Sequence, residues 1–242
     1  QMIQALIDMH SLSHCVLVWD RPEKGFRHEI FPQYKANRTS PPEDLGLQLK
    51  NAREGSARLG IPQLDAPGFE ADDILATIIK KNPNSKFVIV TADKDLLQLV
   101  GPQVWCLDTM KKKWSNVEEA REKFGVTPDM ISQVQALSGD SVDNVPGIPG
   151  VGPKTAIELI QTFGSLDRIL EEAAIRAQAG GKGDWKDKLK GKCLENVAAH
   201  PENARVSLKL VSLHTDVPIA VDLTQLQAHA PDIEGLRAWG QK

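Results

Sequence analysis

Disulfide frameworks, membrane helices and a strong overall charge are all missing from this sequence. The three cysteines, Cys15, Cys106 and Cys193, are far apart and odd in number, which favours free thiols in a reducing compartment. No apolar run approaches the roughly 20 residues that a membrane helix needs, and no signal peptide is visible. The formal net charge is −3, so an anionic partner would have to meet local basic patches. We expect a soluble, cytoplasmic protein without a membrane partner.

The order of apolar and amphipathic segments predicts an α/β fold. Apolar runs at residues 15–19, 87–90 and 104–107 predict buried strands, and they alternate with helical patterns over 42–59 and 71–80. Such alternation builds a mostly parallel sheet with helices on its faces. From residue 117 onward the pattern is mostly helical. We expect an α/β core over residues 1–116 and a helical region over 117–242, packed as one compact unit, with a flexible connection between 173 and 184.

Acidic residues are concentrated in four short clusters, each where an apolar run ends or a helix opens. The eight are Asp20, Glu70, Asp72, Asp73, Asp93, Asp95, Asp140 and Asp143. Ligand-binding groups gather at the carboxyl ends of parallel strands. Two carboxylates about 4 Å apart repel each other by about 4 kcal/mol at an effective dielectric of 20, unless cations neutralise them. The clusters together therefore predict bound metal ions.

Each cluster also has an ordinary structural explanation. Asp20 alone is typical of a turn or cap, and the acidic residues at 70–73 make a favourable first helical turn. Asp93 and Asp95 could cap a helix whose leucines are simply core, and residues 140–144 are rich in turn formers. No single cluster decides between these alternatives.

A glycine-rich segment supplies a different kind of signal. The order NVPGIPGVGPKTA over residues 144–156 places Gly147, Gly150 and Gly152 in a tight loop, and a helix opens at Pro153 or Lys154. Glycines let backbone N–H groups approach a phosphate, and a helix amino terminus favours an anion. An ordinary Gly/Pro turn fits the repeated order less well. We interpret the segment, within 139–162, as a helix-hairpin-helix that grips a nucleic-acid backbone without reading bases.

Several motifs in one order resemble the 5′-nuclease family, namely the bacterial 5′-3′ exonuclease and flap endonuclease that occurs alone or as the amino-terminal domain of DNA polymerase I. They are FRHEIFPQYKANR, GFEADD, VTADKDLLQL, ALSGDSVDNVPGIPGVGPKTA and LVSLHTDVPI, and they cover nearly the whole chain. The resemblance implies a resolvase-like core with a helix-hairpin-helix, and two-metal hydrolysis of phosphodiester bonds. It assigns Glu70, Asp72, Asp73 and Asp93 to the first metal, with Asp20 close by. It assigns Asp95, Asp140 and Asp143 to the second.

The resemblance also implies cofactors and further site residues. Carboxylate and water ligands suit two Mg²⁺ ions, with Mn²⁺ as a substitute, and the family holds K⁺ in the hairpin through loop carbonyls, here at Val145, Ile148 and Val151. Residues 27–41 resemble the arch beside which a 5′ single strand passes, and we expect residues 32–41 to be mobile. In it, Arg27, Lys35 and Arg38 would contact phosphates, with Lys35 and Arg38 in catalytic roles. Tyr34 would stack on a base and, in a helix, share a face with Arg38.

The implied partner is DNA with a 5′ flap or nick, or an RNA primer paired to DNA, in replication and repair in the bacterial nucleoid. We expect a monomer that is fused to, or works with, a DNA polymerase. Two lysine-rich runs, at 111–113 and 182–192, are weaker candidates for touching duplex DNA, and a solvated surface explains them about as well.

One departure from the family pattern concerns the first residues. The family begins with an apolar strand whose Asp ligates the first metal, whereas this sequence opens at Gln1 with a helical pattern over 1–9 that contains Asp8. We expect that strand to precede Gln1 in the full-length protein. The gap keeps a second hypothesis open, a catalytically weakened module that recognises flaps or nicks.

Overall fold

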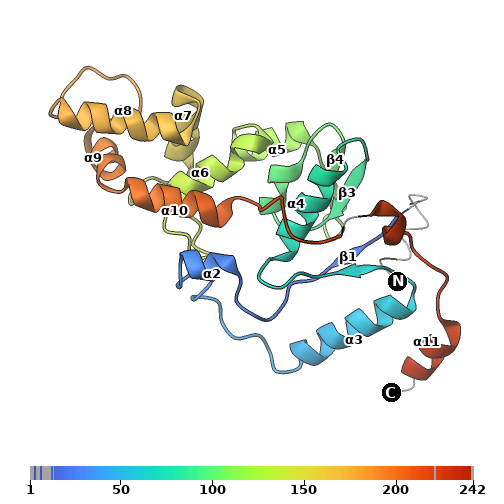
Figure 1. Ribbon diagram of the computed structural model, residues 1–242. Coiled ribbons are helices and arrows are strands. Elements are labelled where there is room, and N and C mark those ends of the chain that lie inside the picture. Colours follow the sequence, from blue (N-terminus) through green and yellow to red (C-terminus); the bar gives the residue numbers. More distant parts are fainter. Residues whose placement is uncertain (1–2, 4–5, 7–11, 13, 221, 241–242) are drawn as a thin grey trace. The chain divides into compact units, whose positions relative to one another are not determined.

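The computed structural model describes residues 3, 6, 12, 14–220 and 222–240. The helix predicted over residues 1–9, including Asp8, therefore lies largely outside the described residues. Figure 1 shows the chain as short strands and many helices. In chain order the elements are β1 (Leu17–Val18), α2 (Phe26–Ile30), α3 (Leu45–Arg58), β2 (Gln63–Leu64), α4 (Ala71–Lys81), β3 (Phe87–Val90), η1 (Asp95–Leu99), β4 (Val104–Asp108), β5 (Lys113–Ser115), α5 (Val117–Phe124), η2 (Pro128–Met130), α6 (Ile131–Ser138), α7 (Pro153–Phe163), α8 (Leu166–Gln178), α9 (Gly191–Ala199), α10 (Pro201–Val211), η3 (Leu223–Leu226) and α11 (Ile233–Trp239).

The chain forms two compact units, and each is built from separate stretches of sequence. The first unit comprises residues 1–25, 39–81 and 214–242, and the second comprises residues 26–38 and 82–213. This grouping does not coincide with the division expected at residues 116 and 117. The reason is that the strands after residue 82 pack with the helices that follow them, through η1, η2 and α6.

The first unit is organised around α4 and a short parallel pair of strands. Leu17 in β1 pairs with Gln63 in β2, and Val18 pairs with Leu64. Helix α4 buries one apolar face, with Ile74 and Ile78 almost fully covered. The carboxy-terminal helix α11 packs on α3, where the Trp239 ring lies against Gly55. The end of the described chain is thus an integral part of this unit.

The second unit contains a mixed three-stranded sheet. Strand β3 pairs in parallel with β4 from Phe87 opposite Val104, and β4 pairs antiparallel with β5 through Cys106 opposite Ser115. The predicted α/β alternation is confirmed by these two sheets and the helices between them. Strand β3 differs from the buried strand expected, because Val88 and Val90 are 41% and 44% exposed.

Strand β4, in contrast, is buried at Cys106, and this burial raises the pKa of the Cys106 thiol to about 11.

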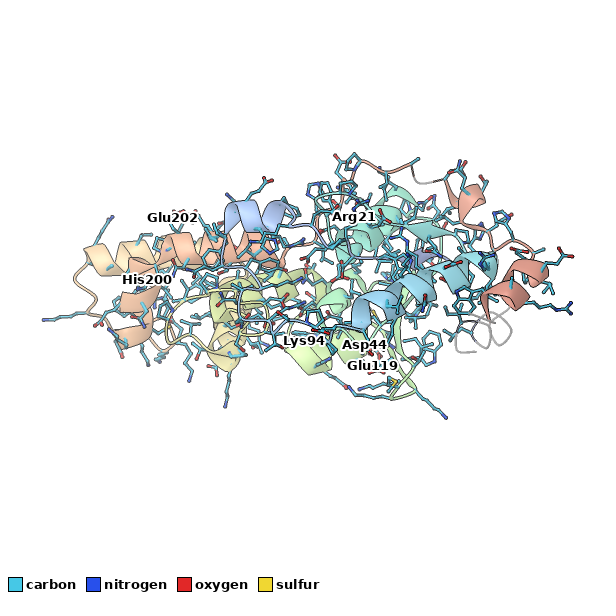
Figure 2. All side chains as sticks on the ribbon, turned by 90° about the horizontal axis from the view of Figure 1, so that it is seen from below. Arg21, Asp44, Lys94, Glu119, His200 and Glu202 are labelled. Atoms are coloured by element: carbon cyan, nitrogen blue, oxygen red, sulfur yellow. The ribbon has the colours of Figure 1, made fainter. Side chains whose placement is uncertain are left out.

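Helix α6 forms the centre of the second unit's helical part. Its residues Ile131 and Leu137 are fully buried, and α7 and α10 pack on it with Leu159 and Leu210. His200 lies at the junction of α9 and α10, where the chain turns before Pro201 (Figure 2). Helix α8 runs to Gln178, so the first part of the segment expected to be a flexible connection is helical. No helix among the described residues has the length and apolar character to cross a lipid bilayer.

The hairpin between α6 and α7 depends on glycines with left-handed backbone. Gly139, Gly147 and Gly150 have φ values of 70°, 59° and 75°. A Cβ atom on Gly147 would collide with the backbone of Ser138 and Gly139, whereas one on Gly152, whose φ is −83°, would meet no atom within 4 Å. Gly147 therefore has a steric role, and Gly152 leaves open space before α7.

These environments predict opposite effects for two similar substitutions. We expect Gly147→Ala to lower the free energy of unfolding by at least about 1–2 kcal/mol, because it combines a left-handed φ with a backbone collision. Gly152→Ala should leave stability within about 0.5 kcal/mol of the wild type. Denaturant unfolding monitored by circular dichroism measures both. Equal effects of the two changes would contradict the hairpin geometry.

Candidate metal and nucleic-acid sites

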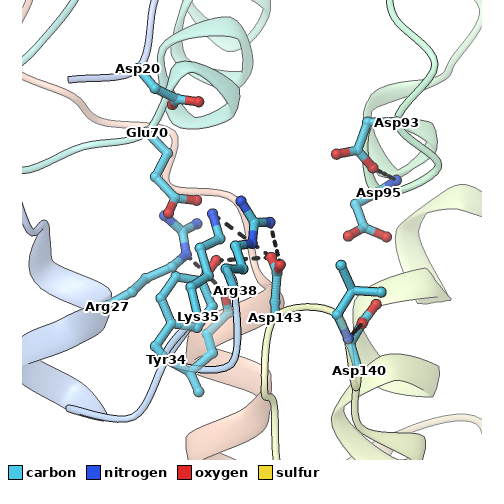
Figure 3. A network of polar contacts seen from close by, with 12 residues as sticks. Asp20, Arg27, Tyr34, Lys35, Arg38, Glu70, Asp93, Asp95, Asp140 and Asp143 are labelled. Carbon is cyan, nitrogen blue, oxygen red and sulfur yellow. Dashed lines mark hydrogen bonds and ion pairs between the residues drawn. The ribbon is translucent and has the colours of Figure 1, made fainter. Parts of the chain in front are cut away.

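In the first unit, the acidic residues surround the start of α4. The Asp20 carboxylate accepts a hydrogen bond from the Ala71 N–H at 2.7 Å, so Asp20 satisfies a backbone donor in the first turn of that helix. Glu70 immediately precedes the helix, and Asp72 lies in its first turn (Figure 3 labels Asp20 and Glu70). Negative charge here is favoured by the helix dipole. The structure thus places Asp20, Glu70 and Asp72 at one helix terminus.

Asp73 occupies a different environment from its neighbours. It is fully buried, and its two carboxylate oxygens accept hydrogen bonds from the Glu70 N–H at 3.1 Å and the His214 N–H at 2.8 Å. One turn later, the buried Thr77 hydroxyl accepts a hydrogen bond from the Val217 N–H at 3.1 Å. The inner face of α4 therefore fastens the 214–217 segment. This gives Asp73 a structural role beyond the favourable first helical turn considered from the sequence.

In the second unit, a cluster of three carboxylates joins the end of β3 to the hairpin. The Asp95 N–H donates to the Asp93 carboxylate at 2.9 Å, which starts η1. Gln135 on α6 donates to Asp95 at 2.7 Å. Lys94 reaches Asp140, with 3.1 Å between the ammonium nitrogen and the carboxylate oxygen. Residues predicted as metal ligands from two distant stretches, 93–95 and 140, are therefore neighbours within one unit.

The pKa values in this cluster have identifiable causes. Burial and the nearby charge of Asp93 raise the pKa of Asp95 above its ordinary value, while the hydrogen bond from Gln135 opposes the shift. Burial also disfavours ionised Asp140, but the Val142 N–H and the Lys94 ammonium outweigh it and hold its pKa below the ordinary value. The cluster thus concentrates negative charge, and Lys94 is the cation that the protein itself supplies.

Asp143 is held by the segment predicted to be the arch. Its carboxylate forms ion pairs with Arg38 and, at 3.8 Å, with Lys35, and the Tyr34 hydroxyl lies 3.3 Å away (Figure 3). The Lys35 N–H also donates to the Asp143 carbonyl at 3.0 Å, in a left-handed conformation with φ of 57°. Tyr34 and Arg38 do reach one target, but through turns instead of the helix considered from their spacing.

Two further bonds dock the same segments on each other. Asn37 donates to the Ser141 carbonyl and Asn144 donates to the Gln33 carbonyl, both at 2.6 Å. Residues 33–38 and 141–144 are therefore joined along their length. Within the stretch expected to be mobile, residues 32–41, these bonds hold residues 33–38. The sequence offers no local sign of them, because the bonded partners are more than 100 residues apart.

Arg27 and Tyr34 are buried, which corrects the prediction that they meet DNA directly. Arg27 is 3% exposed and donates to the carbonyls of Leu210 at 2.7 Å and Ser212 at 3.1 Å, so its guanidinium joins α2 to the end of α10. Tyr34 as a whole residue is 4% exposed, and it packs with Val145 and Leu210 in one buried cluster. In this arrangement neither side chain is open to a phosphate or a base.

The hairpin loop leads directly into α7. Gly150 and Gly152 precede α7, and Lys154 lies exposed in its first turn. The side chains of Val145, Ile148 and Val151 are buried, which anchors the loop. Within it, the Val145 carbonyl accepts the Asp140 N–H and the Ile148 carbonyl accepts the Val151 N–H. Each carbonyl oxygen has a second lone pair that a monovalent cation could use.

The fit of this chain to divalent metal ions rests on donor chemistry. Carboxylate oxygens are the ligands that Mg²⁺ and Mn²⁺ prefer, and the second unit gathers three of them around Lys94. Across the described part of the chain, however, no three His, Cys, Asp or Glu side chains converge closely enough to hold a metal ion. Lys94, Gln135, Asn37 and Asn144 were not predicted from the sequence. Their contacts are with residues that are distant in the sequence, so no local pattern indicates them.

Comparison with known proteins matches both halves of the chain. Residues 1–125 match the N-terminal resolvase-like domain of 5′-3′ exonuclease, and residues 126–234 match its C-terminal SAM fold. The 5′-3′ exonuclease of Aquifex aeolicus is 36% identical over 98% of this chain and 77% of its own length. DNA polymerase I of Rhizobium leguminosarum is 42% identical over 88% of this chain, which spans only 20% of that polymerase.

The solved structures agree on the fold. The flap endonuclease of bacteriophage T5, in a complex with DNA and metal ions, matches with a TM-score of 0.74, 24% identity, and coverage of 99% of this chain and 88% of that one. The fold thus defines a class of proteins in which a resolvase-like domain is followed by a helical domain. By the match of both parts, this chain belongs to the 5′-3′ exonuclease family.

The burial of Asp73 predicts a stability effect that separates it from Asp72. We expect Asp73→Ala to lower the free energy of unfolding by about 2–4 kcal/mol, because two N–H groups lose a buried charged acceptor. Asp72→Ala should cost less, since Asp72 is only partly buried. Thermal and urea unfolding measure both. A larger loss for Asp72→Ala would argue against the structural role of Asp73.

Proposed function

We propose that this chain is a structure-specific 5′ nuclease that hydrolyses phosphodiester bonds of DNA at 5′ ends and flaps. One observation supports this most strongly. Asp140 is bonded to Lys94 in the carboxylate cluster, and its backbone exchanges two hydrogen bonds with Val145 at the start of the hairpin. A carboxylate suited to binding a metal ion is therefore directly followed by a loop suited to binding a phosphate. In the family to which this chain belongs, that combination serves phosphodiester hydrolysis.

Two Mg²⁺ ions, replaceable by Mn²⁺, are part of the proposal. The proposed metal ligands of the second unit are Asp93, Asp95, Asp140 and Asp143, and those of the first unit are Asp20, Glu70 and Asp72. Divalent ions in such a site generate hydroxide and stabilise charge on the phosphate and leaving oxygen. Lys94 would keep the cluster paired before an ion binds, and the carbonyls of residues 145, 148 and 151 would hold K⁺.

The remaining groups have simpler roles in the proposal. The hairpin N–H groups and Lys154 would bind the backbone of the duplex without reading its bases. Lys35 and Arg38 would bind phosphates of the 5′ strand, because they are the cations nearest Asp143. We also propose action on RNA primers paired to DNA, a monomeric state, and joint function with a DNA polymerase, since one relative is a polymerase.

Loss of metal ligands should separate cleavage from binding. We expect the chain to cleave a 5′-flap duplex only with Mg²⁺ or Mn²⁺, and Asp140→Asn with Asp143→Asn to slow cleavage by at least about 100-fold. Asp167→Asn with Glu171→Gln makes the same charge change on α8 and is the matched control. Gel assays of cleavage, with binding measured in Ca²⁺, provide both readouts.

A second candidate function is a flap-binding module with weak or no cleavage. It is favoured by the ion pairs that occupy Asp143 and by the lack of a converged ligand set among the described residues. Flap binding by the wild type without any metal-dependent cleavage would establish this alternative and overturn the enzyme proposal.

The cations beside Asp143 provide a separate test. We expect Lys35→Ala and Arg38→Ala each to slow flap cleavage by about 10-fold or more while leaving duplex affinity nearly unchanged, since their proposed phosphates belong to the 5′ strand. Asn37→Ala, which removes a docking bond but no charge, controls for loosening of the segment. Parallel losses of cleavage and duplex binding would count against this assignment.

A further inference from the structure

Helices α8, α9 and α10 of the second unit line an open groove of about 370 Å³. Helices α8 and α9 pack on each other, and α10 follows α9 directly (Figure 1). The lining residues fall between positions 167 and 205, so they differ from those of the carboxylate cluster and the hairpin. Cavities of about 300–1,000 Å³ are the size that binds ligands or several side chains of a partner. We call this feature the α8–α10 groove.

The floor of the α8–α10 groove is apolar. Leu170 and Val197 close it from below, and both are buried. Ala174, Ala198 and Pro201 complete the lining, and each of them keeps part of its surface open to solvent. The small alanine side chains leave room that larger residues would fill. The groove can therefore receive apolar side chains from outside.

One wall of the groove is a single face of α8. Its lining positions 167, 170, 171 and 174 are three and four residues apart, which places them in line along the helix. Two of them, Asp167 and Glu171, are carboxylates and are exposed. Ile175 lies one turn beyond Glu171 and is 61% exposed, so an apolar side chain also stands at the rim. Acidic and apolar groups thus alternate along the same wall.

The charge bordering the groove is mainly negative. Within the described part of the chain, neither Asp167 nor Glu171 has an ion-pair partner. Arg205 is the cation of the lining, and it pairs with Glu202, its neighbour on α10. Its charge is therefore already balanced, whereas the two carboxylates of α8 are not. An occupant of the groove would gain from carrying positive charge beside its apolar groups.

We infer that the α8–α10 groove is a docking site for an amphipathic helix of a partner protein. Apolar side chains of that helix, spaced i, i+3 or i+4, would enter the groove, and a lysine or arginine would face Asp167 and Glu171. The shared chemistry of the wall and floor favours this occupant, because it satisfies both at once. The inference does not depend on the proposed nuclease function.

Other occupants fit the charge less well. Phosphate groups of nucleic acid and of anionic lipid would be repelled by the two carboxylates. A second copy of the chain, docked by two-fold symmetry, would place the same patch against itself and bring Asp167 and Glu171 of both copies together. A cationic helix avoids both conflicts.

The test begins with a phage-displayed library of random linear peptides, panned on the full chain. We expect the enriched peptides to combine apolar residues at helical spacing with lysine or arginine. The tightest of them is then synthesised, and its Kd is measured by fluorescence anisotropy. Asp167→Asn with Glu171→Gln should weaken binding by about 5-fold or more, because the cation loses its partners. Ala174→Trp should weaken it by about 10-fold or more, because the ring occupies the groove.

The matched control is Glu118→Gln with Glu122→Gln on α5, which also removes two exposed carboxylates that are four residues apart from the start of a helix of the same unit. Its Kd should equal that of the wild type. Circular dichroism checks that every variant is folded. Flap cleavage should be the same in both groove variants as in the wild type, so a wild type that cleaves no flap would count against the proposed nuclease function alone.

Several results would overturn the inference. They are a selection that yields no binding peptide, enriched peptides without the basic and apolar pattern, an unchanged Kd in the Asp167, Glu171 double variant, and an equal loss in the α5 control. Sedimentation gives one more. Dimerisation of the wild type that Ala174→Trp abolishes would assign the groove to a second copy of the chain.

Discussion

The reciprocal hydrogen bonds between Asp140 and Val145 are the constraint on which the proposed function depends. The Asp140 N–H donates to the Val145 carbonyl at 3.1 Å, and the Val145 N–H donates back at 2.7 Å. They close the loop that presents Asp143 and fix where the hairpin begins. The Asp140 carboxylate also forms an ion pair with Lys94. This one residue therefore positions both the carboxylate cluster and the glycine loop. The left-handed Gly139 and Gly147 make that closure sterically possible.

Carboxylates in this protein are neutralised mainly by groups of the protein itself. Asp73 has two backbone N–H donors, Asp140 has Lys94, and Asp143 has Lys35 and Arg38. If the proposed function holds, a divalent ion entering the second unit would compete with ammonium and guanidinium groups that already pair with the carboxylates. Phosphates of a bound strand would then be the acceptors for the displaced cations. Metal affinity and substrate binding would then be thermodynamically coupled.

Sequence reasoning succeeded where the controlling physics is local. Strand ends, the first turn of α4 and the glycine order of the hairpin are short-range patterns, and they placed Asp20, Asp93 and Asp140 correctly in their elements. It failed where a distant partner decides. No residue near Arg27 or Tyr34 in the sequence indicates that both contact Leu210. For Asp73, the only local sign of an inward orientation is its i, i+4 relation to Thr77.

The interleaved construction of the two units has a consequence for how this chain can be divided. The backbone passes from one unit to the other four times, at residues 25–26, 38–39, 81–82 and 213–214. No continuous fragment therefore contains the whole of the first unit without the second. Its core cannot be completed until residues beyond 214 are available, so folding during synthesis must wait for long-range closure. The fold should therefore tolerate an insertion into a surface loop of either unit better than it tolerates being cut into separate fragments.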